Sequence, residues 1–162
     1  MTTPPMPGEN LPPTKLDDAR EQLYLAASRV WVALGWPADR AFPYPPRQVL
    51  TPSAWVDVPT LHLAPTERAR AMAATFPIVF LTDGSQEQQV KLQDRLLAHA
   101  WDQLDNLTVG QHRATVQSAG PEDLEVVPGS FVRGLAIRVQ IPLAVQTLCP
   151  QKLARDDDEG TG

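Results

Sequence analysis

Residues 135–145 contain the pattern that most constrains the fold of this chain. Every second residue from Leu135 to Val145 is apolar, while Arg138 and Gln140 face the other way. A period of two places successive side chains on opposite faces of an extended chain, so the pattern predicts a β-strand with one buried face. A slip of one residue would bury Arg138 and Gln140, so the pattern also fixes the register. The chain must therefore form a sheet, and one face of that sheet needs an apolar cover.

Two segments with a helical period can supply this cover. In the first, Thr14 and Asp17 form a capping box at the N-terminal end. In the second, Ser85 and Gln88 form a Ser-x-x-Gln capping box. The expected buried positions are Leu16, Ala19, Leu23, Ala27, Val30 and Leu34 in the first helix, and Val90, Leu97, Trp101 and Leu104, widened by Leu96, Ala100 and Leu107, in the second.

Shorter segments predict further strands between and after the helices. Pro59 separates two of these strands. Residues 66–74 are expected to form a helical turn or a loop. The pairs Gly120-Pro121 and Pro128-Gly129 are expected to bracket a loop or hairpin end. Each helix has one apolar stripe to bury, which predicts an α+β fold: an antiparallel or mixed sheet with two amphipathic helices packed on one face, plus a proline-rich extended arm. The predicted short strands are 54–58, 60–63, 76–81 and 113–117.

Seventeen prolines divide the chain into segments. Proline lacks an amide hydrogen and restricts the residue before it, so its clusters disfavour regular structure. A length of 162 residues is typical of one domain. We therefore expect a flexible N-terminal arm at 1–13, a single α+β domain at 14–150 that contains a proline-rich excursion at 37–65, and an acidic disordered tail at 151–162.

The excursion combines aromatic and basic residues with its prolines. Tyrosine, tryptophan and arginine are enriched at the centres of protein interfaces, which favours a contact with another subunit or a partner. If so, deletion of residues 41–52 should leave a folded monomer. Alternatively, the aromatic rings plug the core of the monomer itself. The candidate interface residues are Arg40, Phe42, Tyr44, Arg47 and Trp55.

A second candidate surface is the polar face of the predicted sheet. Arg138 and Gln140 point away from the apolar face of the last strand, and Arg113 and Gln117 alternate in the same way on a neighbouring strand. A polar sheet face of this kind is either covered by water or meets a partner.

The chain contains no pattern that predicts catalysis. His62, His99 and His112 are not spaced as metal ligands, and the lone Cys149 has no oxyanion-hole turn beside it. A net charge of −5 argues against a nucleic-acid-binding surface, and no apolar run approaches the roughly 18 residues of a membrane span. We therefore predict no catalytic, cofactor-binding or metal-binding residue, no membrane partner and no enzymatic activity.

The order of elements resembles the tail terminator proteins of long-tailed bacteriophages. The shared order is an N-terminal helix after a short arm, an excursion with strands, a strand that leads into a capped helix over 76–107, and two strands that end with 134–145. The resemblance covers roughly residues 14–148. It implies a ring, usually a hexamer of this chain, that caps the tail tube, stops its polymerisation and joins the tail to the head.

The resemblance also implies the partners and the location of the protein. The partners are the tail tube protein and a head-tail connector or stopper protein, and DNA only passes through the lumen. Arg113, Gln117, Arg138 and Gln140 are then expected to face the lumen or a neighbouring subunit. The protein would belong to the virion, in the tail or neck, after assembly in the host cytoplasm. Two alternatives stay open: another neck or connector protein such as a head-tail stopper, or a small non-catalytic binding domain.

Overall fold

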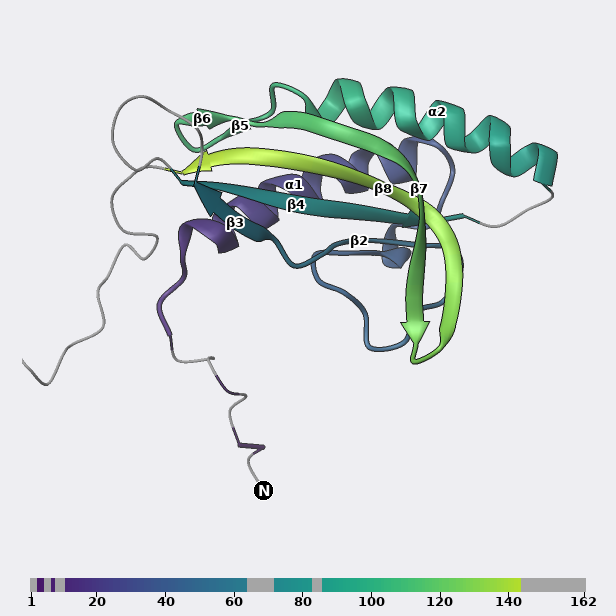
Figure 1. The fold of residues 1–162 in the computed structure, drawn as a ribbon, viewed down its shortest axis with the longest axis horizontal. Coiled ribbons are helices and arrows are strands. Elements are labelled where there is room, and N and C mark those ends of the chain that lie inside the picture. The colour runs from purple at the N-terminus through teal and green to yellow at the C-terminus, as the bar shows by residue number, and fades with distance from the viewer. Residues whose placement is uncertain (1–2, 5–6, 8–10, 64–71, 83–85, 144–162) are drawn as a thin grey trace, which may run out of the picture.

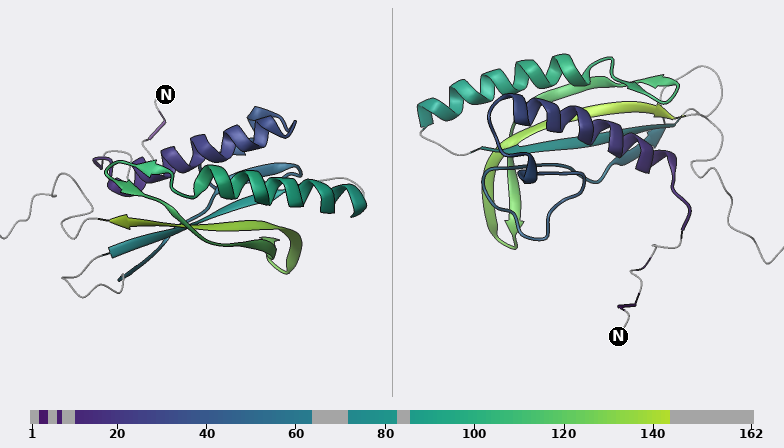
Figure 2. Two further views of the ribbon diagram at one scale, coloured as in Figure 1. Left: turned by 90° about the horizontal axis from the view of Figure 1, so that it is seen from above. Right: turned by 180° about the vertical axis from the view of Figure 1, so that it is seen from behind.

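Two helices lie side by side on one face of a twisted sheet (Figures 1 and 2). The computed structural model describes residues 3–4, 7, 11–63, 72–82 and 86–143, so the acidic tail and most of the N-terminal arm lie outside the described residues. The elements are α1 (Lys15–Ala33), a 3-10 turn (Ala38–Arg40), β1 (Ala41–Phe42), β2 (Ser53–Val56), β3 (Thr60–Leu63), β4 (Met72–Leu81), α2 (Gln86–Leu104), β5 (Thr108–Val109), β6 (His112–Arg113), β7 (Thr115–Val127) and β8 (Ser130–Leu143).

Among the described residues, six strands form the main sheet in the order β1-β2-β4-β8-β7, and β3 pairs with the other end of β4. Only β1 and β2 are parallel, and every other pair in the main sheet is antiparallel. β5 and β6 form a separate two-stranded ribbon. This architecture confirms the predicted α+β class with a mixed sheet and two helices on one face.

The last strand has the predicted face and register. Val139 pairs with Phe76 of β4 on one side and with Val116 of β7 on the other, and all three side chains are buried. Arg138 and Gln140 are half-buried on the opposite face. β8 begins at Ser130, earlier than the alternation itself, because its first residues pair with β7 in a hairpin. The buried alternating positions of β8 are Leu135, Ile137, Val139, Ile141 and Leu143.

Helix α1 also agrees with the prediction. Asp17 Oδ2 accepts a hydrogen bond from the Thr14 amide at 2.6 Å, and Thr14 Oγ1 accepts one from the Asp17 amide at 3.3 Å. These two bonds form the predicted capping box. At the far end, the buried Trp31 stacks on Trp36 with ring centroids 4.4 Å apart. Its indole Nε1 donates to the carbonyl of Pro37 at 2.9 Å, which fixes the direction of the chain as it enters the excursion.

The predicted buried face of α2 is partly wrong. Leu96, Ala100 and Leu104 are fully buried, whereas the exposed fractions of Val90 and Trp101 are 52% and 40%. The helix has two apolar stripes, and α1 and the sheet cover only the one that recurs every four residues. Val90 and Trp101 therefore lie on the outer surface. The predicted cap at Ser85 lies outside the described residues.

Two further segments differ from the prediction. Residues 72–74 belong to β4 rather than to a helical turn or loop, because they pair with β3 and β8 on either side. Gly120 and Pro121 belong to β7 rather than to a loop. β7 is an edge strand, where the missing amide hydrogen of a proline interrupts no ladder. Pro128 and Gly129 do form the predicted hairpin turn, with Gly129 at a φ of +81°.

A second apolar cluster lies on the sheet face opposite the helices. Trp55, Val79 and Leu81 are buried there, so this face is polar over only part of its area. The cover comes from the excursion and from the β7–β8 hairpin, which bends away from the helices (Figure 1). The residues packed around the cluster are Phe42, Val49, Leu124 and Val132.

Gly134→Ala is expected to destabilise the fold by about 1–3 kcal/mol, the usual cost of overpacking. A Cβ atom at Gly134 would lie 2.6 Å from a methyl carbon of Leu81 and 3.0 Å from the carbonyl oxygen of Phe80. Urea unfolding measures the loss. Gly120→Ala is the matched control because nothing lies within 4 Å of the added atom. Equal stability of the two variants would contradict this packing.

Candidate interaction surfaces

Arg20 of α1 holds two points within the excursion, at residues 43 and 56–57, against the body of the protein. Its Nη1 donates to the carbonyls of Pro43 at 3.0 Å and Val56 at 2.5 Å, and its Nη2 donates to the carbonyl of Asp57 at 3.1 Å. The guanidinium also stacks over the ring of Tyr44, 4.9 Å from its centroid. The described part of the excursion is therefore attached to the domain rather than extended away from it.

The guanidinium of Arg20 is a buried charge whose hydrogen-bond acceptors are backbone carbonyls. Only 9% of the residue is exposed, and burial lowers its pKa, while the nearby Tyr44, Asp57 and Asp17 act in the opposite direction. Arginine nevertheless stays protonated in proteins. Arg20 thus supplies one fixed cation beneath the excursion.

The structure separates the five predicted interface residues. Tyr44 and Arg47 are exposed, while Arg40 and Phe42 are half-buried. Trp55 is only 6% exposed and belongs to the second apolar cluster. The half-buried Phe42 packs against the same cluster, so both rings contact the core of the monomer. Residues 41–52 also include β1, so their deletion is not expected to leave the fold intact.

Two buried polar atoms lie on the strand that enters this cluster. Ser53 Oγ and Trp55 Nε1 have no hydrogen-bond partner among the described residues. They sit two residues apart on β2 and therefore on the same face of the sheet. Both atoms therefore belong to the strand of the excursion that contributes Trp55 to the second cluster.

Three of the four residues predicted for the polar sheet face, Gln117, Arg138 and Gln140, lie together on it. Gln117 Nε2 donates to Gln140 Oε1, and Thr75 Oγ1 donates to Gln117 Oε1 at 3.5 Å. Arg138 Nη2 donates to Glu122 Oε1 at 2.9 Å, and this hydrogen bond raises the pKa of Arg138. The resulting surface carries neutral amides and one compensated charge. Arg113, the fourth predicted residue, is exposed at the end of β6, two residues before β7 begins.

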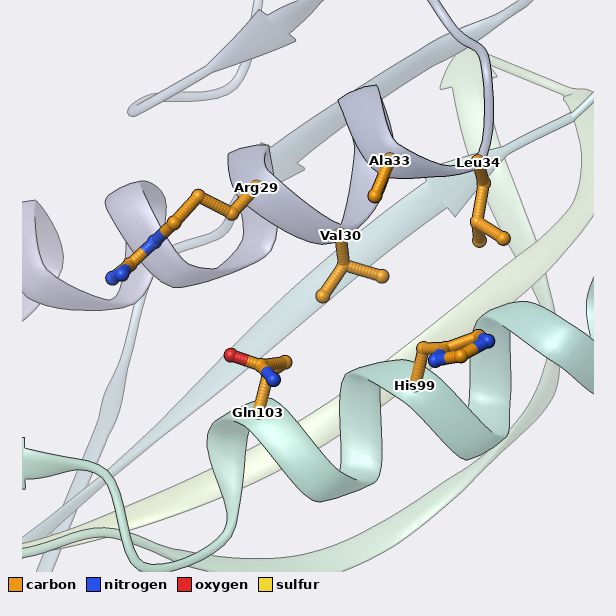
Figure 3. Close-up of a pocket in the computed structure, with 6 residues that line it drawn as sticks. All are labelled: Arg29, Val30, Ala33, Leu34, His99 and Gln103. Atoms are coloured by element: carbon orange, nitrogen blue, oxygen red, sulfur yellow. The ribbon is translucent and has the colours of Figure 1, made fainter.

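A groove of about 290 Å³ lies between α1 and α2 (Figure 3). Val30 and Leu34 project into it from α1, and His99 and Gln103 line it from α2. Its volume is at the lower limit of ligand pockets, so it has room for one large side chain rather than for a cofactor. The six residues that line the groove include one arginine and no carboxylate; they are Arg29, Val30, Ala33, Leu34, His99 and Gln103.

The tip of the β7–β8 hairpin exposes large apolar side chains. Phe131 is 63% exposed and Val127 is 57% exposed, on either side of the Pro128-Gly129 turn. Glu125 Oε1 accepts a hydrogen bond from the Gly129 amide at 2.9 Å, which braces the turn. We call residues 123–133 the hairpin tip.

Sequence reasoning missed Arg20, the groove and the hairpin tip. A charged residue within a helix is usually solvated, and the carbonyls that Arg20 binds are 23 to 37 positions away. The groove requires the packing of two helices, which no local pattern encodes. The tip had one usable signal, because Val127 and Phe131 flank a turn that the sequence does predict.

No family model matches the chain, and no curated protein sequence matches it. Within the part of the chain that the structure describes, no group of three or more histidine, cysteine or carboxylate residues could hold a metal ion. No helix in that part is long and apolar enough to cross a membrane. Cys149 lies outside the described residues.

Proposed function

We propose that this protein is a tail terminator: a ring of identical subunits that caps a phage tail tube, stops its growth and presents a surface to the head connector. The proposal combines the resemblance in element order with the distribution of exposed apolar side chains. The latter is the observation that carries it.

Pairs of large apolar side chains are exposed on five separate parts of the described surface, one of them Leu25 and Val32 on α1. Single exposed apolar residues are normal, but repeated pairs indicate contact surfaces. A subunit of a closed ring needs two different patches for its neighbours and further surfaces for axial partners. The other four pairs are Tyr44 and Leu50 on the excursion, Leu61 and Leu63 on β3, Val90 and Trp101 on α2, and Val127 and Phe131 at the hairpin tip.

The polar sheet face supports a lumenal position in such a ring. Arg138 is compensated by Glu122, and the amides of Gln117 and Gln140 are neutral. A duct for DNA needs a surface that does not neutralise many phosphates, because strong neutralisation would hold the passing duplex. We assign the exposed part of the excursion, with Tyr44, Arg47 and Leu50, to the contact with the tail tube.

Electron microscopy of the purified protein is expected to show rings, and mixing with tail tubes of the same phage is expected to place one ring at a tube end. Tube length should then stop increasing when tube protein is added, which a length distribution measures. A protein that forms rings but binds purified connector instead of tubes would be a stopper. Absence of rings together with absence of tube binding would contradict both neck functions.

A further inference from the structure

We infer that two copies of this chain join head to tail, with the hairpin tip of one copy seated in the α1–α2 groove of the next. This inference rests on the proposed function in that the contact would close the ring. It assigns the subunit contact to Phe131 and the groove rather than to the excursion.

The hairpin tip has the properties of an inserted knob. Phe131 is 63% exposed at the end of a long two-stranded hairpin, where it pairs with Glu125 of the other strand. The hydrogen bond from the Gly129 amide to Glu125 Oε1 holds the turn. Across the two strands, Arg133 Nη1 lies 3.8 Å from Asp123 Oδ1. A braced tip loses little conformational entropy when it binds.

The groove has the properties of the complementary hole. Its floor is apolar, with Val30 buried and Leu34 half-buried, and its volume of about 290 Å³ suits a single aromatic side chain. Hot-spot aromatic residues characteristically insert into such partly preformed pockets.

The charges of the two surfaces are complementary. The hairpin tip carries Asp123, Glu125 and Arg133, hence two negative charges and one positive, for a net charge of −1. The groove carries Arg29 and no carboxylate among its lining residues. An attraction between them would favour the correct encounter and would weaken in salt.

The hairpin tip and the groove lie too far apart in one chain to contact each other, so the contact must join two copies. The hairpin bends away from the helix layer, whereas the groove lies within that layer (Figure 2). A tip therefore does not reach the groove of its own chain. A contact between two different patches is heterologous, and heterologous contacts close into rings or continue as filaments.

Two single substitutions test the contact in the full-length protein. Phe131→Ser removes the knob, and Ala33→Glu places a carboxylate in the hole at an exposed position of α1. Each is expected to weaken self-association by at least about 30-fold, as for loss of a hot spot. Sedimentation velocity is expected to give the mass of one chain, 17.8 kDa, at a concentration where the unmodified protein is assembled. Circular dichroism is expected to stay unchanged.

Matched controls separate this contact from general loss of surface apolarity or added charge. Val58→Ser removes an equally exposed apolar side chain, and Ala98→Glu adds a carboxylate to α2 outside the groove. Both controls are expected to assemble as the unmodified protein does.

Mixing the two interface variants gives the sharpest result. Phe131→Ser keeps an intact groove and Ala33→Glu keeps an intact tip, so an equimolar mixture is expected to form a dimer with one contact and no ring. A mixture that stays monomeric, variants that still assemble, or an unmodified protein that is monomeric up to about 1 mM would each overturn the inference. Rings that depend on Phe131 but do not bind tail tubes would contradict the terminator function and would leave the subunit contact supported.

Discussion

Replacement of Val139 by aspartate is expected to abolish soluble expression of the protein. Val139 is fully buried in the central pair of strands, where Phe76 and Val116 flank it. A carboxylate there would lose its hydration without gaining a cation, which costs several kcal/mol. That cost is comparable with the whole stability of a domain, which is typically about 5–15 kcal/mol. The measurement is the soluble fraction after expression, followed by circular dichroism of any soluble product.

The neighbouring residue provides the control for Val139→Asp. Arg138 lies on the opposite face of the same strand, and more than a third of its side chain is exposed. Its ion pair with Glu122 is therefore expected to contribute no more than about 1 kcal/mol, so Arg138→Ala should fold normally. A soluble Val139→Asp protein with native stability would contradict the position of this strand in the core.

The different burial of Val139 and Arg138 was predictable from the sequence because a strand's two faces alternate with a fixed period. The same holds for α1, where the spacing of apolar residues and the Thr14–Asp17 box are local features. Local patterns are sufficient to predict the buried face wherever a helix or strand has a single apolar face. They therefore predicted the α+β class, the last strand and the first helix.

Helix α2 illustrates where such patterns fail. Its sequence offers two apolar stripes, one through Leu96, Ala100 and Leu104 and one through Val90 and Trp101. Periodicity identifies both stripes, and only the packing against α1 and the sheet decides which is buried. The burial of Trp55 in the excursion was unpredictable for a related reason, since the residues that pack against it come from β4 and the distant β7–β8 hairpin.

Candidate surfaces were harder to predict than the fold. The polar amides on the sheet face follow from strand alternation, and the structure brings Gln117 and Gln140 together as expected. The groove and the attachment of the excursion depend on long-range contacts. The buried Arg20 was the hardest residue to predict. A charged side chain is expected to be exposed, and only the folded structure shows the distant carbonyls that bind this one.

Arg20→Met is expected to lower the free energy of unfolding by about 3 kcal/mol. Methionine keeps much of the apolar stem but donates no hydrogen bond, so the carbonyls of Pro43, Val56 and Asp57 lose their donor. Unsatisfied buried acceptors typically cost about 1–3 kcal/mol each, and relief of the guanidinium's own desolvation offsets part of the sum. Urea unfolding measures the difference.

The lost stability in Arg20→Met should also arise locally, because the three carbonyls all lie at the two ends of the segment 43–57 of the excursion. Proteolysis under native conditions is therefore expected to cut between residues 43 and 57 faster than in the unmodified protein. Arg29→Met is the matched control on the same helix, since among the described residues the side chain of Arg29 donates to the carbonyl of Leu25 within α1. Equal stability and equal cleavage rates for the two variants would show that Arg20 does not hold the excursion. A selective loss in Arg20→Met would identify this arginine as the residue that holds Tyr44 and its neighbours against the domain.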